Sequence, residues 1–97
     1  MLRRRRFGDL IDRQLAFVVE EERWLLDDVD ASRAAWVAAP RDEAEERFGD
    51  YQLALEALKD RLTEIRDTYA ATLEDPDEYE REFEREVVRR WRDIEAV

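Results

Sequence analysis

The chain has 97 residues, of which 45% are charged, and a formal net charge of −10, which allows one small domain with a thin apolar core. It contains no Cys and no His. Disulfides, thiol or imidazole catalysis, and metal sites built on Cys or His are therefore excluded. Strong helix formers dominate and only two Gly and two Pro are present, which predicts an all-α fold with long helices. The longest apolar run, Leu15–Val19, is too short to span a membrane, and we expect a cytoplasmic protein.

Residues 1–8 form a basic leader that precedes a single helical domain over residues 9–97. The leader carries four consecutive positive charges, at Arg3, Arg4, Arg5 and Arg6. Two interpretations remain open for them. They contact phosphate in nucleic acid or at an anionic membrane surface, which would make the protein an adaptor. Alternatively, they belong to a disordered leader or contact the acidic body of another copy of the chain.

The first helix is predicted over about residues 10–38, with Asp9 as its N-cap. Its apolar seam advances in steps of four and three residues, at Ile11, Leu15, Val18, Leu25, Val29 and Trp36. A second apolar stripe recurs every seven residues, at Leu10, Phe17, Trp24 and Ala31. A helix that is apolar on two sides needs two neighbours. One is the second helix, and the other is either the third helix or a second copy of the protein.

Glu22 interrupts the apolar seam of this first helix. Because a buried carboxylate is costly unless it is paired, we expect Glu22 to pair with an arginine across the seam and to set the register of the two helices. The alternative is a functional carboxylate, since catalytic acids often occupy such positions.

Pro40 ends the first helix and predicts a sharp reversal at Ala39–Arg41 into a second helix over about residues 41–73. Its apolar seam is an unbroken heptad pattern, at Ala44, Phe48, Tyr51, Leu55, Leu58, Leu62, Ile65 and Tyr69. Such a narrow seam is typical of coiled-coil-like packing against one partner helix. We therefore expect a long antiparallel helical hairpin.

The third helix is predicted over about residues 76–95. Asp75 is its expected N-cap, Pro76 its first residue and Glu78 the partner in a capping box. The predicted fold is thus a three-helix up-down-up bundle built on a long antiparallel hairpin. Because the third helix is short, part of the hairpin would remain uncovered, and a homodimer would bury that apolar strip.

Two pairs of acids on the second helix have the spacing E-x-x-E and E-x-x-D, at Glu43 and Glu46 and then at Glu64 and Asp67. This pattern resembles the all-α MazG-type nucleotide pyrophosphatases. The resemblance covers about a quarter of the chain. It implies an enzyme whose inward-facing acids hold Mg²⁺ over a triphosphate. The heptad pattern, however, assigns these four acids to solvent-facing positions.

The interpretation that fits the whole sequence is a small acidic helical module that self-associates and binds another protein. Large aromatic side chains dominate the energy of protein interfaces. The expected partner interface is therefore the second stripe, at Leu10, Phe17 and Trp24. The sequence supports no catalytic, cofactor-binding or metal-binding residue.

Overall fold

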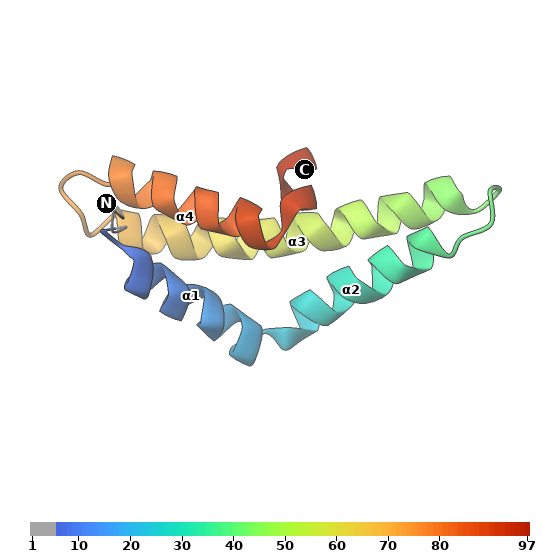
Figure 1. The fold of residues 1–97 in the computed structure, drawn as a ribbon, viewed down its shortest axis with the longest axis horizontal. Helices are drawn as coiled ribbons and strands as arrows, with labels where there is room; N and C mark the ends of the chain where they lie inside the picture. The colour runs from blue at the N-terminus through green and yellow to red at the C-terminus, as the bar shows by residue number, and fades with distance from the viewer. Residues whose placement is uncertain (1–5) are drawn as a thin grey trace, which may run out of the picture.

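The computed structural model describes residues 6–97, so Arg3, Arg4 and Arg5 of the predicted leader lie outside the described residues. Residues 6–97 contain four α-helices, a short C-terminal 3-10 helix and no strand, which confirms the all-α class. The elements are α1 (Gly8–Glu21), α2 (Arg23–Val37), α3 (Ala44–Ala70), α4 (Asp77–Arg90) and η1 (Arg92–Ala96) (Figure 1). Over this range, no helix is both long and apolar enough to cross a membrane.

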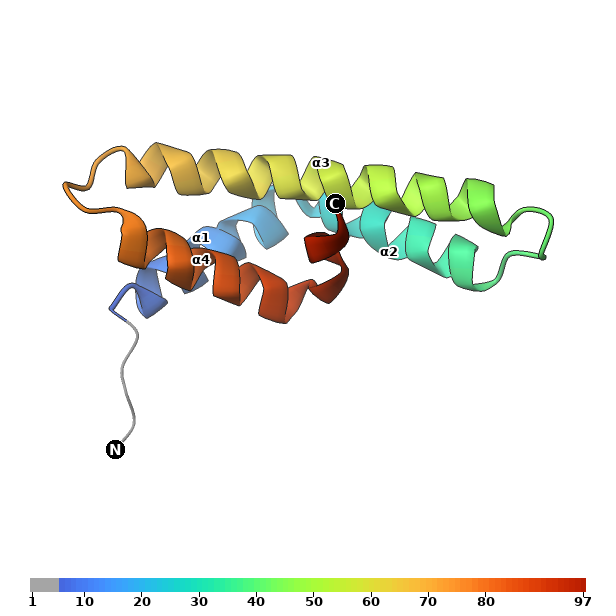
Figure 2. The same cartoon turned by 90° about the horizontal axis from the view of Figure 1, so that it is seen from above.

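The longest helix, α3, forms the axis of the molecule. Its 27 residues correspond to about 40 Å, in a molecule that measures 50 × 30 × 21 Å. α2 packs along one half of α3, and α4 returns along the other half (Figures 1 and 2). α1 contacts both α3 and α4.

The prediction of a single helix over residues 10–38 is wrong, because the chain leaves helical geometry at Glu22. The φ and ψ angles of Glu22 are −125° and 40°, and α1 and α2 diverge from this point as a V beside the straight α3 (Figure 1). The break lets α2 follow α3 while α1 turns toward α4. Four α-helices therefore take the place of the predicted three-helix up-down-up bundle.

The third predicted helix, over residues 76–95, also ends earlier than expected. α4 ends at Arg90, and Trp91 has a φ of −132° and a ψ of 80°, after which η1 folds back toward α3. The Tyr51 hydroxyl donates a hydrogen bond to Asp93 at 2.7 Å, and Ile94 is buried. These tertiary contacts stabilise a turn that the local sequence does not predict. The second predicted helix, over residues 41–73, is shorter at both ends, since α3 covers Ala44–Ala70.

The predicted helix caps are only partly correct. Asp9 is not the N-cap of α1, because the helix begins at Gly8 and the Phe7 N–H donates to the Glu82 carboxylate of α4 at 3.1 Å. The Asp75 carboxylate accepts the Asp77 N–H at 3.3 Å, but Pro76 and not Asp75 is the N-cap of α4. The predicted capping box is also wrong, since the Glu78 carboxylate pairs with Arg6 instead. Helix α4 begins at Asp77, one residue after the predicted start.

The apolar core is concentrated on one side of α3. Its seam residues Tyr51, Leu55, Leu58 and Leu62 are all buried, as are Ile11, Leu15, Val18, Leu25 and Val29 from α1 and α2 and Tyr79, Phe83 and Val87 from α4. Phe48 belongs to the same heptad pattern but is 36% exposed. It lies near the hairpin turn, where Trp36 covers it from one side with ring centroids 4.8 Å apart.

Two leucines on α3 give a matched test of this core. Leu58 is fully buried, whereas Leu53 is 66% exposed. We expect Leu58→Asp to lower the free energy of unfolding by more than about 4 kcal/mol, because it places an unpaired charge in the core. Leu53→Asp should change it by less than about 0.5 kcal/mol. Thermal unfolding followed by circular dichroism measures both, and equal effects of the two substitutions would contradict this packing.

Candidate functional site

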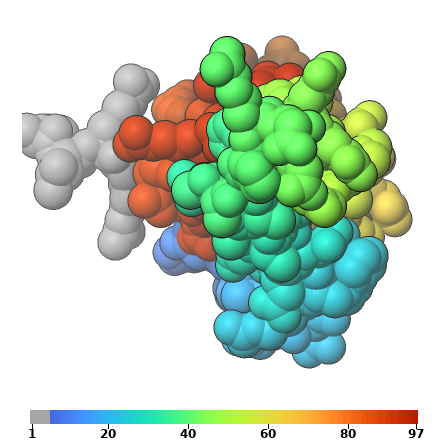
Figure 3. All heavy atoms as spheres, turned by 90° about the vertical axis from the view of Figure 1, so that its right-hand side faces the viewer, coloured from blue at the N-terminus to red at the C-terminus, as the bar shows by residue number. Residues whose placement is uncertain are grey.

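Two of the three residues predicted to form a partner interface are exposed aromatic side chains. Phe17 on α1 is 49% exposed and Trp24 in the first turn of α2 is 66% exposed, and the two lie on either side of the break at Glu22. Leu10 is half-buried and packs against the core. Leu10, Phe17 and Trp24 are together called the aromatic face. Viewed from the hairpin end, the light-blue segment around the α1–α2 junction forms the lower edge of the molecule (Figure 3).

The aromatic face continues into an open groove between α1 and α3. Phe17 from α1 and Ile65 and Tyr69 from α3 supply its apolar surface, and its volume is about 650 Å³. Its remaining lining residues are Arg13, Gln14, Arg61, Glu64, Thr68 and Thr72. The groove lies on α1 and α3 alone, with no lining residue from α4.

Most polar groups of this groove are already engaged within the protein. The Gln14 side-chain carbonyl accepts a hydrogen bond from the Tyr79 hydroxyl at 2.9 Å. Arg61 pairs with Glu64 at 3.3 Å and with Glu22. Because these groups are satisfied, the groove offers apolar contact area, with Arg13 as an exposed charge at its side.

Glu22 pairs across the seam, as predicted. Arg61 Nε lies 2.7 Å from each Glu22 carboxylate oxygen, and both side chains are less than one-third exposed. The hydrogen bond to Glu22 raises the pKa of Arg61 above its ordinary value. The carboxylate at the helix break is therefore held by a charge-assisted contact to α3, which confirms the predicted pairing with an arginine across the seam.

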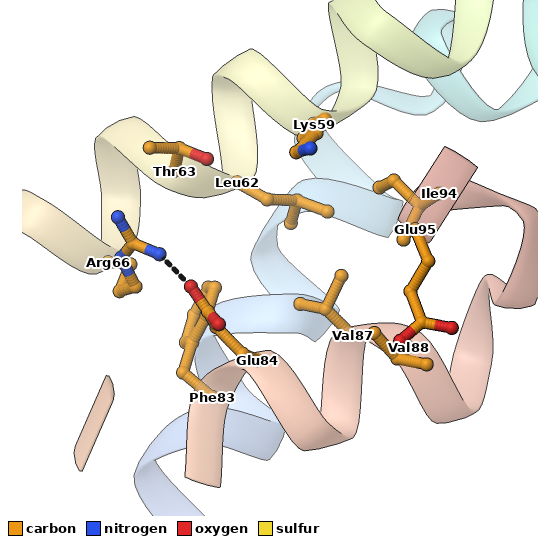
Figure 4. Close-up of a pocket in the computed structure, with 10 residues that line it drawn as sticks. All are labelled: Lys59, Leu62, Thr63, Arg66, Phe83, Glu84, Val87, Val88, Ile94 and Glu95. Carbon is orange, nitrogen blue, oxygen red and sulfur yellow. Dashed lines mark hydrogen bonds and ion pairs between the residues drawn. The ribbon is translucent and has the colours of Figure 1, made fainter. Parts of the chain in front are cut away.

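A second cavity, of about 270 Å³, lies between α3, α4 and η1 (Figure 4). The buried side chains of Leu62, Phe83, Val87 and Ile94 contribute to its lining. Both of its cations have partners: Arg66 pairs with Glu84, and Lys59 donates to the Val97 carbonyl. Sequence reasoning missed this cavity because it exists only where η1 folds back onto α3.

Two buried carboxylates link α4 to α1. One oxygen of Glu82 accepts the Phe7 N–H, while its other oxygen is buried and has no hydrogen-bond partner within residues 6–97. Glu86 accepts hydrogen bonds from Arg89 and Arg90, and Arg90 also reaches Asp12 of α1 at 3.2 Å. The hydrogen bond from Arg89, reinforced by Arg90, lowers the pKa of Glu86 to about 2.

The acids that resemble those of MazG-type enzymes do not converge on a metal site. Glu46, Glu64 and Asp67 are exposed on α3. Glu43 pairs with Arg47, and Asp67 pairs with Arg66. In the part of the chain that the structure describes, no group of three or more Asp or Glu residues is arranged to hold a metal ion.

Only one of the four leader arginines predicted to contact phosphate falls within the described residues. Arg6 pairs with Glu78 of α4 at 3.4 Å, and its guanidinium lies 5.1 Å from the centre of the Phe7 ring. Its side chain is 70% exposed. Arg6 thus contributes to the junction of α1 and α4 while its charge remains at the surface.

The comparisons with known proteins give no relative. No protein-family model, no curated protein and no solved structure matches this chain.

The two acids that contact Arg61 provide a matched test of the ion pair at the helix break. We expect Glu22→Ala to lower the free energy of unfolding by about 1–2 kcal/mol, because Arg61 loses its partly buried partner. Glu64→Ala, which removes the exposed partner, should cost less than about 0.5 kcal/mol. Urea unfolding distinguishes them, and an equal cost for both would show that the Glu22 contact is not structural.

The low pKa of Glu86 predicts how the free energy of unfolding changes as the pH falls. Since the pKa in the folded protein lies below the ordinary value of 4.5, ionised Glu86 stabilises the fold above about pH 4.5. That contribution is lost as the pH falls toward 2. Over this range the wild type should lose roughly 2–3 kcal/mol more stability than Glu86→Gln. Glu46→Gln on α3, at an exposed position where no ion pair within residues 6–97 involves the carboxylate, is the control. Parallel stability–pH curves for wild type and Glu86→Gln would refute the prediction.

Proposed function

We propose that this protein is a small helical interaction module that self-associates through the aromatic face. The observation that carries the proposal is the exposure of Phe17 and Trp24, at 49% and 66%. Aromatic side chains bury roughly 150–250 Å² each and dominate interface energetics. An apolar patch left open in this way marks an interaction site.

The groove beside Phe17 supports the same proposal. Its apolar residues Ile65 and Tyr69 are half-buried, so they offer contact area that a neighbouring helix would cover. The polar groups Gln14 and Arg61 already have partners within the chain, so covering them does not leave an unsatisfied charge. Such a surface suits helix-in-groove association, in which an amphipathic helix lays its apolar side between two others.

A second copy of the protein is the proposed occupant because the aromatic face is self-complementary in charge. In a two-fold antiparallel contact centred on Phe17, residues at equal distances before and after Phe17 face each other across the two copies. Phe17 then meets its own copy at the centre, and Arg13 lies opposite Glu21 of the second copy. The contact combines an aromatic centre with flanking pairs of opposite charge, and the exposed Trp24, just beyond the helix break, extends its apolar surface.

The test compares two exposed apolar side chains, Trp24 and Val37, which are 66% and 67% exposed. We expect Trp24→Ala to raise the dissociation constant of self-association at least about 30-fold, because it removes a central aromatic anchor. Val37→Ala should leave that constant within about twofold. Sedimentation equilibrium measures both, together with circular dichroism to show that folding is retained. An unchanged assembly mass for Trp24→Ala would remove the aromatic face as the interface.

A further inference from the structure

Two further surfaces, one on α3 and one on α4, lie apart from the aromatic face. They carry charged side chains that form no ion pair within residues 6–97. Arg81 and Arg85 on α4 and Glu56 and Asp60 on α3 are all exposed. Within residues 6–97 none of these four takes part in an ion pair, although neighbouring charges on the same helices do. These four charges are positive on α4 and negative on α3.

On each helix these charges share a surface with one apolar residue. Arg81, Arg85 and Val88 follow each other in steps of four and three residues, and they form what is called the α4 outer stripe. Leu53, Glu56 and Asp60 follow in steps of three and four residues, and they form the α3 outer stripe. On an α-helix this spacing places three side chains in one line about 10 Å long.

Arg81, Arg85 and the α3 outer stripe point away from the core of their own chain, whereas Val88 is half-buried at the edge of the cavity between α3, α4 and η1. The α4 residues that contact α3 and α1 are others, namely Glu80, Glu84, Glu82 and Arg90. On α3, Leu58 and Leu62 form the buried side, and Leu53 is 66% exposed on the opposite side. Leu53 is a large apolar residue beside exposed acids, and residues 6–97 leave most of its side chain uncovered.

Opposite charges on the two stripes face each other when the two helices pack antiparallel. Val88 then lies opposite Leu53, Arg85 opposite Glu56 and Arg81 opposite Asp60. We propose that the α4 outer stripe of one copy docks antiparallel against the α3 outer stripe of a second copy. The contact pairs these four charges and brings Leu53 beside the half-buried Val88, and it does not depend on the aromatic face.

This contact is heterologous, because it joins two different surfaces of the same chain. Each copy therefore keeps one stripe of each kind for a further neighbour, which allows assemblies larger than a dimer. The contact area is small and charged. We therefore expect a low affinity that falls further as the salt concentration increases. If the aromatic face already joins two copies, several such contacts act together and their avidity strengthens the assembly.

The two stripes can be tested by reversing their charges separately and then together. The first variant is Arg81→Glu with Arg85→Glu, and the second is Glu56→Arg with Asp60→Arg. The controls, Arg41→Glu and Glu74→Arg, reverse exposed charges in the connecting turns, where no ion pair within residues 6–97 involves either residue. Sedimentation velocity at low ionic strength, over a range of protein concentrations, gives the assembly constant for each.

We expect each double variant alone to raise the dissociation constant of concentration-dependent assembly at least about tenfold, because like charges then face each other. An equimolar mixture of the two should restore assembly, since the intact stripe of each variant finds a complementary stripe in the other. The controls should stay within about twofold of the wild type.

Three outcomes would overturn the proposal. One is a mixture that fails to restore assembly, and another is an equal loss in the controls. The third is an effect of the arginine reversal without any effect of the acid reversal, which would assign the arginines to a different anionic partner. Trp24→Ala tests the aromatic face independently, so a failure of that interface leaves the result of the charge reversals interpretable.

Discussion

The burial of one apolar side of α3 is the constraint on which the rest of the structure depends. Leu58 and Leu62 are almost fully buried, and α1, α2, α4 and η1 all contact this helix. A chain of this size has little other apolar surface to bury. The seam therefore decides where each remaining helix lies, and the side chains that do not reach it are left at the surface.

The break at Glu22 follows from this constraint and creates the aromatic face. A carboxylate at this seam position is stable only with a partner, which Arg61 supplies at 2.7 Å. Beyond that contact α1 turns toward α4, where the Arg90–Asp12 pair and the Glu82–Phe7 contact hold it. Because α4 lies on one side of α1, Phe17 on its other side remains uncovered.

The sequence predicted the helical class, the buried seam of α3 and the pairing of Glu22, because each depends on a local pattern or on a strong energetic rule. It did not predict the break at Glu22, because the steps of four and three residues continue across it from Val18 to Leu25. It also missed η1, since Trp91 carries no turn signal and the fold-back depends on Tyr51 and Lys59, far away in the chain. Exposure of Phe17 and Trp24 was the open question in the sequence, because the third helix was the other candidate to cover them.

The charged side chains of α3 and α4 differ in whether they form ion pairs within the chain. The buried acid Glu86 is paired with Arg90, and at the surface Glu84 is paired with Arg66. In the two outer stripes the charges without an ion pair are positive on α4 and negative on α3. Apolar association through the aromatic face and charge-dependent association through the outer stripes would respond oppositely to salt, since added salt screens only the second.

The measurement that tests the central claim most directly is the solution mass of the intact protein, by sedimentation equilibrium over a wide concentration range at high salt. Under these conditions the proposed contact between outer stripes would be screened, and only the proposed interface at the aromatic face would act. Self-association through Phe17 and Trp24 predicts a mass that rises from one chain to two as concentration increases. A mass of one chain at every concentration would contradict it.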